Sequence, residues 1–193
     1  MRQKINELKK TTILEIAHDA FKANGYESTA ISAIAKEAGV SIGTIYGFFE
    51  NKEGVFQAVH TMKMQQALEM FKALFAQNPN APKENLKATL RFYFTTIEEH
   101  KISVQEMLLS LPSKIGCPMA DADPHIAMYE LMASEIEKLN VEHTLKGDDY
   151  LQYAFNMRNL AASYIERWAL LGDIELSAKV DECLEIFLGG IIK

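Results

Sequence analysis

Residues 29–49 read TAISAIAKEAGVSIGTIYGFF, and this stretch decides the fold. Residues 30–37 carry isoleucine and alanine at the spacing of one helical face, which predicts a short helix. Gly39 can adopt the left-handed backbone that a sharp corner needs. Ser41 stands where the N-cap of a second helix belongs, before Ile42 and Gly43. The stretch therefore predicts two short helices joined by a tight turn.

The second of these helices has a slim outer face. Its spacing turns Val40, Ile45 and Phe49 inward, and its outward positions are small: Ser41, Gly43, Thr44 and Gly47. Small polar side chains at a helix N-terminus suit phosphate contact and close approach to base edges. The pattern indicates a helix-turn-helix that enters a DNA groove. An ordinary helix pair in a bundle is the alternative that this stretch alone leaves open.

The flanking residues decide between these two interpretations. Residues 13–56 resemble the DNA-binding domain of TetR-family transcriptional regulators, in a long ordered pattern rather than a short motif. The matching positions are Ile13, Leu14, Ala17, Ala20, Phe21, Gly25, Tyr26, Thr29, Ile34, Ala35, 38–41, 43–46, Phe49, Lys52 and Glu53. The resemblance implies an all-α fold of about nine helices. A three-helix helix-turn-helix head would occupy residues 1–50, and a helical bundle body residues 51–193.

The chain departs from the family pattern in two places. Ala30 and Ala33 replace the residues of a capping box, so we expect Thr29 to cap the first short helix, with Ser32 at its third position. Phe48 stands where the family usually has tyrosine or histidine, and its ring can only pack or touch a thymine methyl group. We expect DNA contacts from ten residues: Thr29, Ser32, Ser41, Ile42, Gly43, Thr44, Tyr46, Gly47, Phe48 and Lys52.

Basic residues precede the packed part of the first helix. In family members such residues often reach the DNA backbone or the minor groove, and a merely solvated helix start is an equally open interpretation. The four residues are Arg2, Lys4, Lys9 and Lys10.

Composition limits the possible classes of protein. The formal charge is −6, which argues against indiscriminate nucleic-acid binding. Residues 1–54 hold seven basic and seven acidic residues, so the net negative charge belongs to the remainder. The two cysteines, Cys117 and Cys183, have no metal-ligand spacing. We find no signal peptide and no membrane-spanning run, and we expect a soluble cytoplasmic protein that does not enter membranes.

Helical spacing continues through the rest of the chain. A long helix over residues 52–77 begins after Asn51, which can cap it, and carries a weakening Gly54 in its first turn. This helix belongs to both head and body. Further helices are expected at residues 5–24, 83–100, 103–111, 124–140, 149–171 and 174–188.

The helix at residues 149–171 is apolar on more than one side, and the last helix carries apolar residues at helical spacing. Two adjacent, strongly hydrophobic helices fit a two-fold four-helix dimer interface. The family dimerises through the corresponding pair, so the resemblance implies a homodimer. We expect its contacts from Leu160, Leu176, Val180, Leu184 and Phe187.

The body is rich in methionine and aromatic residues. Most of these are core residues in the simplest interpretation, but thioethers and flat rings also line adaptable apolar pockets. We therefore predict a pocket for a small hydrophobic effector, lined by Met62, Phe94, Met107, Met128, Met132, Phe155, Tyr164 and Trp168.

No catalytic constellation is present in the sequence, and we expect neither an enzyme nor a cofactor. Asp121 and Asp123 with His125 could bind a metal, but capping of a helix by Asp123 is favoured. Cys117 is expected to be an inert thiol.

Together these features predict a homodimeric repressor that a small apolar effector releases from a palindromic operator. The alternative is a DNA-binding protein whose body binds a protein partner instead.

Overall fold

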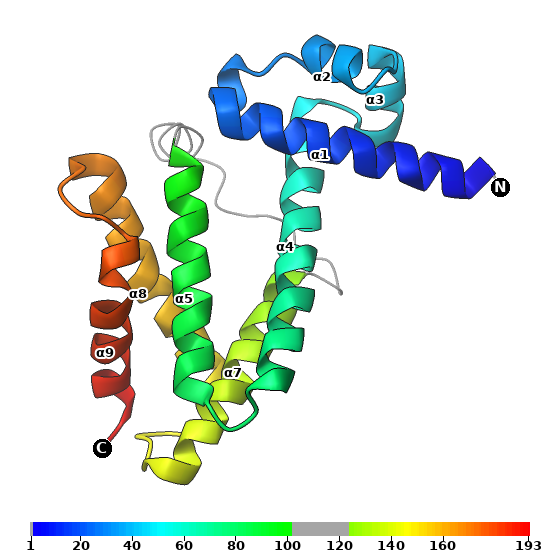
Figure 1. Ribbon diagram of the computed structural model, residues 1–193. Helices are drawn as coiled ribbons and strands as arrows, with labels where there is room; N and C mark the ends of the chain where they lie inside the picture. Colours follow the sequence, from blue (N-terminus) through cyan, green and yellow to red (C-terminus); the bar gives the residue numbers. More distant parts are fainter. Residues whose placement is uncertain (1, 102–123) are drawn as a thin grey trace. The chain divides into compact units, whose positions relative to one another are not determined.

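The computed structural model describes residues 2–101 and 124–193 (Figure 1). In that part of the chain the structure has eight α-helices, one 3-10 helix and no strand, which confirms the predicted all-α fold. The helices are α1 (Arg2–Ser28), α2 (Ile31–Glu37), α3 (Ile42–Phe49), α4 (Lys52–Gln77), α5 (Pro82–Glu99), α7 (Pro124–Glu142), α8 (Tyr150–Leu171), η1 (Ser177–Lys179) and α9 (Val180–Ile191). Some predictions lie outside the described residues: the helix at 103–111 and the roles of Met107, Cys117, Asp121 and Asp123.

The chain divides into two compact units. In the described residues, the first covers 2–66 and the second covers 67–101 together with 124–193. Helix α4 contributes residues to each, and we call the first unit the head and the second the body. The domain boundary expected after residue 50 stays a prediction.

The head is built around one apolar cluster. Helix α1 supplies Ile13, Ala17 and Phe21, and the helix-turn-helix and the start of α4 supply Ile31, Ile34, Ala35, Ile45, Val55 and Val59. Helix α1 is interrupted at Gly25, whose φ of 79° and ψ of 170° are not helical. Tyr26 then packs its ring against Phe21, at 5.8 Å between centroids, and against Phe56, at 5.1 Å.

A carboxylate fastens α1 to α4 inside the head. Glu15 accepts hydrogen bonds from Lys63 Nζ at 2.6 Å and from Gln66 Nε2 at 3.2 Å. The bond from Lys63 holds the pKa of the Glu15 carboxyl below its ordinary value. Because the two donors lie one turn apart on α4, the carboxylate fixes α1 against that turn.

The turn between α3 and α4 is unusually tight. Glu50 has a φ of 64° and a ψ of −52°, and the N–H of Asn51 donates to the carbonyl of Phe49 at 2.7 Å. Asn51 Oδ1 accepts from the N–H of Gly54 at 2.8 Å, which confirms its predicted capping role. A Cβ at Gly54 would lie 2.0 Å from the Phe49 carbonyl oxygen. Close packing therefore requires glycine at position 54. The sequence alone indicates only that this glycine weakens the first turn of the helix.

The body packs α5 against α7, α8 and α9. Leu86, Leu90 and Phe94 of α5 are buried at the centre of this arrangement, with Ile136 of α7 and Met157 of α8. A second apolar cluster joins the C-terminal half of α4 to α7 through Ala67, Phe71, Phe75, Leu74, Met128 and Leu131.

One buried carboxylate sets the register of α7 on α5. Glu135 is 1% exposed, and it accepts a hydrogen bond from Asn85 Nδ2 at 2.7 Å. Lys138 forms an ion pair with the same carboxylate, and Asn85 also donates to the carbonyl of Asn78 at 3.0 Å. A buried charge is tolerated because these partners satisfy it.

Helix α9 begins six residues later than residue 174, where we expected it. The 3-10 helix η1 precedes it, and Glu98 of α5 accepts hydrogen bonds from the N–H groups of Leu176, at 2.6 Å, and Ser177, at 3.4 Å. The Glu98 carboxylate, from a distant part of the chain, thus caps the first turn at η1. Residues 174 and 175 therefore lie before the helical segment.

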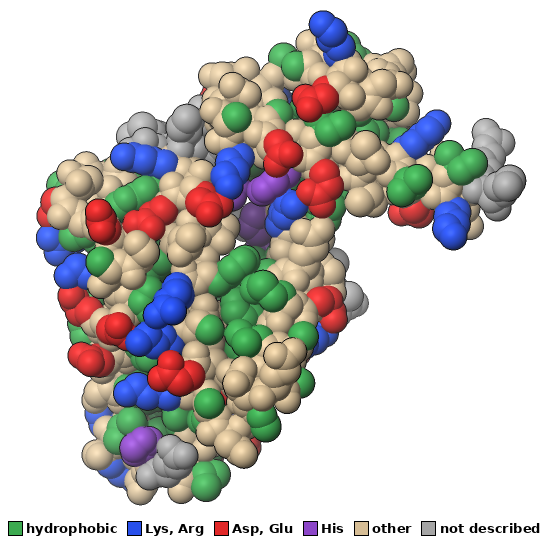
Figure 2. All heavy atoms as spheres, viewed as in Figure 1, with side chains coloured by type: hydrophobic (Ala, Val, Ile, Leu, Met, Phe, Trp, Pro, Cys, Tyr) green, Lys and Arg blue, Asp and Glu red, His purple; other side chains and the backbone are tan. Residues whose placement is uncertain are grey.

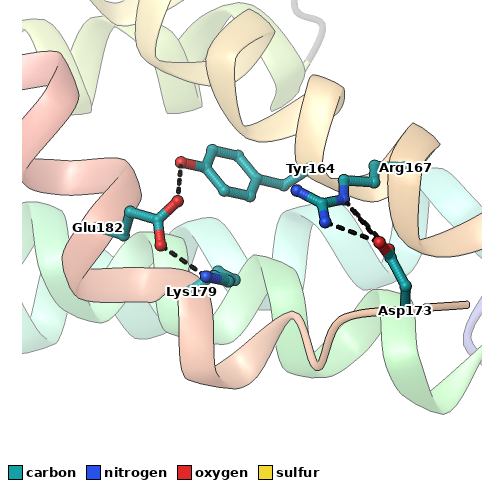
Figure 3. A network of polar contacts seen from close by, with 5 residues as sticks. All are labelled: Tyr164, Arg167, Asp173, Lys179 and Glu182. Carbon is teal, nitrogen blue, oxygen red and sulfur yellow. Dashed lines mark hydrogen bonds and ion pairs between the residues drawn. The ribbon is translucent and has the colours of Figure 1, made fainter.

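A polar network closes the α8–α9 connection (Figure 3). The Tyr164 hydroxyl donates to Glu182 Oε1 at 3.0 Å, and Lys179 Nζ lies 2.6 Å from Glu182 Oε2. Burial, followed by the bond to Glu182, raises the pKa of Tyr164 to about 12. Arg167 forms a two-pronged ion pair with Asp173, with Nη2 2.7 Å from Oδ2.

The residues predicted to form a dimer interface stay a prediction, and most of them are already buried within one subunit. Leu176, Val180, Leu184 and Phe187 are all buried within their own subunit, and Leu160 is half-buried. These four side chains belong to the monomer core because α9 turns its regular apolar stripe toward α5 and α8. The large apolar side chains exposed on α8 and α9 are Leu151, Leu170, Leu171 and Ile186.

Among the described helices, none combines the length and the apolar character needed to cross a membrane.

Candidate nucleic-acid interface

Helix α3 forms as its sequence predicts. Ser41 Oγ accepts the N–H of Thr44 at 3.0 Å and lies 2.8 Å from the Thr44 hydroxyl oxygen, which confirms the N-cap. Gly39, with a φ of 64°, turns the chain between α2 and α3. The helix is anchored by the fully buried Ile45, and its outer residues Ser41, Ile42, Gly43, Tyr46 and Gly47 are exposed.

A hollow of about 460 Å³ lies beside this exposed face. The end of α1, the start of α2, helix α3 and the start of α4 all contribute to it. Its lining residues are Glu27, Ser28, Thr29, Ala30, Ile31, Ser32, Ile42, Tyr46 and Lys52. Five residues that the sequence predicts as DNA contacts therefore lie around one concavity: Thr29, Ser32, Ile42, Tyr46 and Lys52.

Thr29 has a different role from the two that we expected. Its hydroxyl donates to the carbonyl oxygens of Gly25, at 2.6 Å, and Ala20, at 3.1 Å, and the residue is only 4% exposed. The N-cap of α2 is Ala30, with no side-chain bond. Thr29 ties the interrupted end of α1 to the start of α2, and the proposed DNA contacts therefore exclude its side chain.

Lys52 is held at the rim of the hollow. Its Nζ donates to the carbonyl of Glu27 at 3.0 Å and lies 4.6 Å from the centre of the Tyr26 ring. These two contacts hold the Lys52 ammonium in place at a hollow that Tyr46 also lines. A phosphate group could bind here, because the hollow offers the Lys52 ammonium, the Tyr46 hydroxyl and an uncrowded helix surface.

Phe48 packs against the head core rather than standing free. It is half-buried, and its ring centroid lies 6.0 Å from that of Phe49. Lys10 of α1 places its Nζ 5.5 Å from the centre of the Phe48 ring. In the sequence Lys10 is one of four basic residues near the start of α1, and nothing in the pattern indicates its contact with α3.

Comparison with known proteins identifies the head. Residues 13–59 match the family model "Bacterial regulatory proteins, tetR family". These residues form a DNA-binding domain of the TetR type. The chain is 32% identical over 97 residues to the "Fatty acid metabolism regulator protein" of Bacillus subtilis (strain 168), a match that covers 50% of each chain. It is also 36% identical over 63 residues to the "HTH-type transcriptional regulator UidR" of Escherichia coli (strain K12), which is 33% of this chain and 32% of that protein.

The chain spans about half the length of the first of these curated relatives and about a third of the second. Both relatives are named as regulators, and the second is named as an HTH-type transcriptional regulator. Solved structures extend the likeness of fold over nearly the whole chain. FadR from Bacillus subtilis in complex with stearoyl-CoA has a TM-score of 0.70 at 21% identity, covering 94% of this chain and 98% of that one. Thermus thermophilus FadR in complex with lauroyl-CoA has a TM-score of 0.69 at 22% identity, covering 95% of each chain.

The predicted ligand-binding residues in the described part of the chain do not line one common hollow. Phe94 and Tyr164 meet at 6.1 Å between ring centroids, whereas Phe155 stacks on Tyr129 and Met128 packs on the α4–α7 cluster. Met132 and Trp168 are buried core residues. Met62 belongs to the head.

The second hollow, of about 380 Å³, lies between α7 and the start of α8. Four carboxylates line it, from Glu130, Glu137, Asp148 and Asp149. Within residues 2–101 and 124–193, no group of three or more histidine, cysteine or acidic side chains has the geometry to hold a metal ion. Burial raises the pKa of the Cys183 thiol to about 11, so that sulfur is a weak nucleophile.

Proposed function

We propose that this TetR-family protein is a homodimeric transcriptional repressor that reads a palindromic operator with α3. The observation that carries the proposal is the exposed face of α3 beside a concavity that already holds Tyr46 and Lys52. Ser41, Gly43 and Gly47 allow the helix backbone to approach base edges, while the Lys52 ammonium provides a phosphate contact. Two heads bind half-sites about 34–36 Å apart, one turn of the double helix.

The proposed dimer uses the outer faces of α8 and α9. Leu170, Leu171 and Ile186 are large apolar side chains left exposed on these helices, and Ile186 is 52% exposed. Burying them against a second copy removes apolar surface from water without disturbing the subunit core. Gly189 and Gly190 lie exposed on α9, with space around them for a closely approaching partner.

A pair of variants on α9 separates subunit stability from assembly. Leu184→Ala removes a buried side chain, and we expect it to lower the free energy of unfolding by about 2–5 kcal/mol. Ile186→Asp changes an exposed side chain two residues away, and we expect folded monomers. Thermal unfolding and sedimentation velocity measure the two effects. A fully dimeric Ile186→Asp protein would place the interface elsewhere.

The effector is proposed to bind an apolar surface on the body. Figure 2 shows apolar side chains gathered between α5 and the C-terminal half of α4. Met70 and Phe92 are exposed there, and Phe92 meets the edge of Phe71 at 5.3 Å between ring centroids. Met128 of α7, a predicted ligand residue, packs against the same cluster. Flat rings and a thioether suit a long apolar chain.

The chemical class of the effector is proposed from the relatives. Two solved structures of the same fold are complexes with lauroyl-CoA and stearoyl-CoA, and a curated relative is named a fatty acid metabolism regulator. We propose a long-chain fatty acyl thioester as the effector. It releases the operator only to the extent that it binds the DNA-free conformation more tightly.

The experiment begins with a duplex selected from a random pool by the purified protein. A mobility shift on that duplex is then repeated with stearoyl-CoA, lauroyl-CoA and, as a control, coenzyme A alone. We expect a palindromic selected sequence and release by the acyl thioesters but not by coenzyme A. Failure to enrich any sequence contradicts the DNA-binding proposal, and binding indifferent to every acyl thioester contradicts the effector class.

The same apolar surface favours one alternative. Met70 and Phe92 are exposed, and neither described hollow is lined by them, which also suits a protein partner in place of a small molecule. Operator binding that ignores small apolar compounds but changes with a co-purifying protein would support this alternative.

A further inference from the structure

The N-terminal part of α1 carries a lysine that reaches the recognition helix. The first residue of the head core is Ile13, so the preceding turns of α1 lie before the packed part of the helix. In these turns Ile5 and Leu8 are exposed, and Lys9 is exposed as well. Lys10 differs from its neighbours because its Nζ lies over the ring of Phe48, near the C-terminal end of α3.

The Phe48 ring gives this lysine a defined position. An ammonium 5.5 Å from a ring centroid is attracted to the negative face of the ring. The ring is itself held, because Phe48 packs on the head core and beside Phe49. The lysine side chain, usually free to sample many rotamers, is therefore partly ordered on the surface of α3 before DNA arrives.

Phe48 cannot supply a polar contact from its own position. Its side chain has no donor for a phosphate oxygen, whereas the lysine above it carries three N–H donors and a full charge. We propose that Lys10 and Phe48 act as a unit. The ring positions the ammonium, and the ammonium contacts an operator phosphate at the C-terminal end of α3. This inference rests on the proposed function and extends it to a phosphate contact supplied by α1.

A neighbouring carboxylate competes for the same cation. Glu7, one turn earlier on α1, lies 3.5 Å from Lys10 Nζ. The pair is largely solvent-exposed, so it is weak and a phosphate can replace it. Glu7 thus lowers the affinity for DNA, since its attraction for Lys10 is lost when the phosphate binds.

The first test is the salt dependence of binding to the selected duplex. Each phosphate contact contributes about 0.9 to the slope of log K against log salt concentration. Lys10→Gln is expected to reduce that slope by about 0.9 per subunit, or about 1.8 for a dimer. Lys9→Gln is the matched control, with the same charge change at the adjacent exposed position, and is expected to leave the slope near the wild-type value.

The second test measures coupling between ring and cation. Phe48→Leu keeps an apolar group but removes the ring face, and we expect binding weakened by up to about fivefold. In the Lys10→Gln background the same change is expected to have no further effect, because no cation remains to be positioned. Glu7→Gln is expected to tighten binding by up to about fivefold in the wild-type background only.

The outcomes separate this inference from the proposed function. Equal slopes for Lys10→Gln and Lys9→Gln, in variants that unfold at the wild-type temperature, would overturn the phosphate contact. Equal losses from Phe48→Leu in both backgrounds would overturn the positioning by the ring. A wild-type protein that binds no selected duplex would contradict the proposed function itself, before any variant is compared.

Discussion

Replacing Gly43 with glutamate is expected to abolish operator binding while the protein stays folded. Gly43 is exposed on α3, and a Cβ added there would meet only the Ser41 hydroxyl oxygen at 3.7 Å, an ordinary contact. Glutamate also has a higher helix propensity than glycine. On DNA the same side chain would fill the space left for base edges and carry a negative charge toward the phosphates. We expect a loss of at least about 100-fold in affinity, roughly the effect of two good base contacts.

The matched control adds the same charge away from the proposed interface. Ala76→Glu changes an exposed residue of α4 in the body and alters the net charge equally. It is expected to bind the selected duplex nearly as well as the wild type. Mobility shift and thermal unfolding of both variants decide the matter. Normal binding by a folded Gly43→Glu protein would exclude α3 from the DNA interface.

The second large effect is a loss of stability expected at Phe94 of α5. Comparison with Phe92 on the same helix distinguishes a core residue from a residue of the proposed effector surface. Phe94 is fully buried and packs on Tyr164, so Phe94→Ala is expected to lower the free energy of unfolding by about 3–5 kcal/mol. Phe92 is 39% exposed, and Phe92→Ala is expected to leave stability within about 1 kcal/mol of the wild type. Urea unfolding with the duplex and the effector absent measures both changes.

Effector binding is expected to show the reverse order. Phe92→Ala removes the exposed ring on Phe71 and is expected to raise the concentration of stearoyl-CoA needed to release the duplex. Isothermal calorimetry at a temperature where both variants are folded gives the affinities directly. If Phe94→Ala were as stable as the wild type but no longer bound the acyl thioester, Phe94 would line the pocket, as its sequence pattern first indicated.

The head was predictable because its signals are local. Ser41 accepts a hydrogen bond three residues along, Gly39 adopts its own left-handed conformation, and Asn51 caps a helix that starts at the next residue. Each such prediction depends on a few consecutive residues, and the structure confirms all three. The inward set of Val40, Ile45 and Phe49 follows from helical spacing in the same way.

The features that the sequence alone could not settle depend on contacts between distant parts of the chain. Thr29 reads as a polar cap, but the kink at Gly25 brings carbonyl groups of α1 to its hydroxyl. The stripe of Leu176, Val180 and Leu184 is apolar at helical spacing, yet spacing cannot tell whether it faces the subunit core or a second copy. Lys10 and Phe48 are 38 residues apart, and their contact appears only once α1 and α3 are packed.

The most direct test of the account is backbone hydrogen exchange with and without the selected duplex. We expect the amides of residues 41–48, together with those around Ser32 and Lys52, to exchange more slowly when DNA is bound, with little change in α9. Unaltered exchange across residues 41–48 in a saturated protein–DNA complex would contradict the claim that α3 lies against DNA.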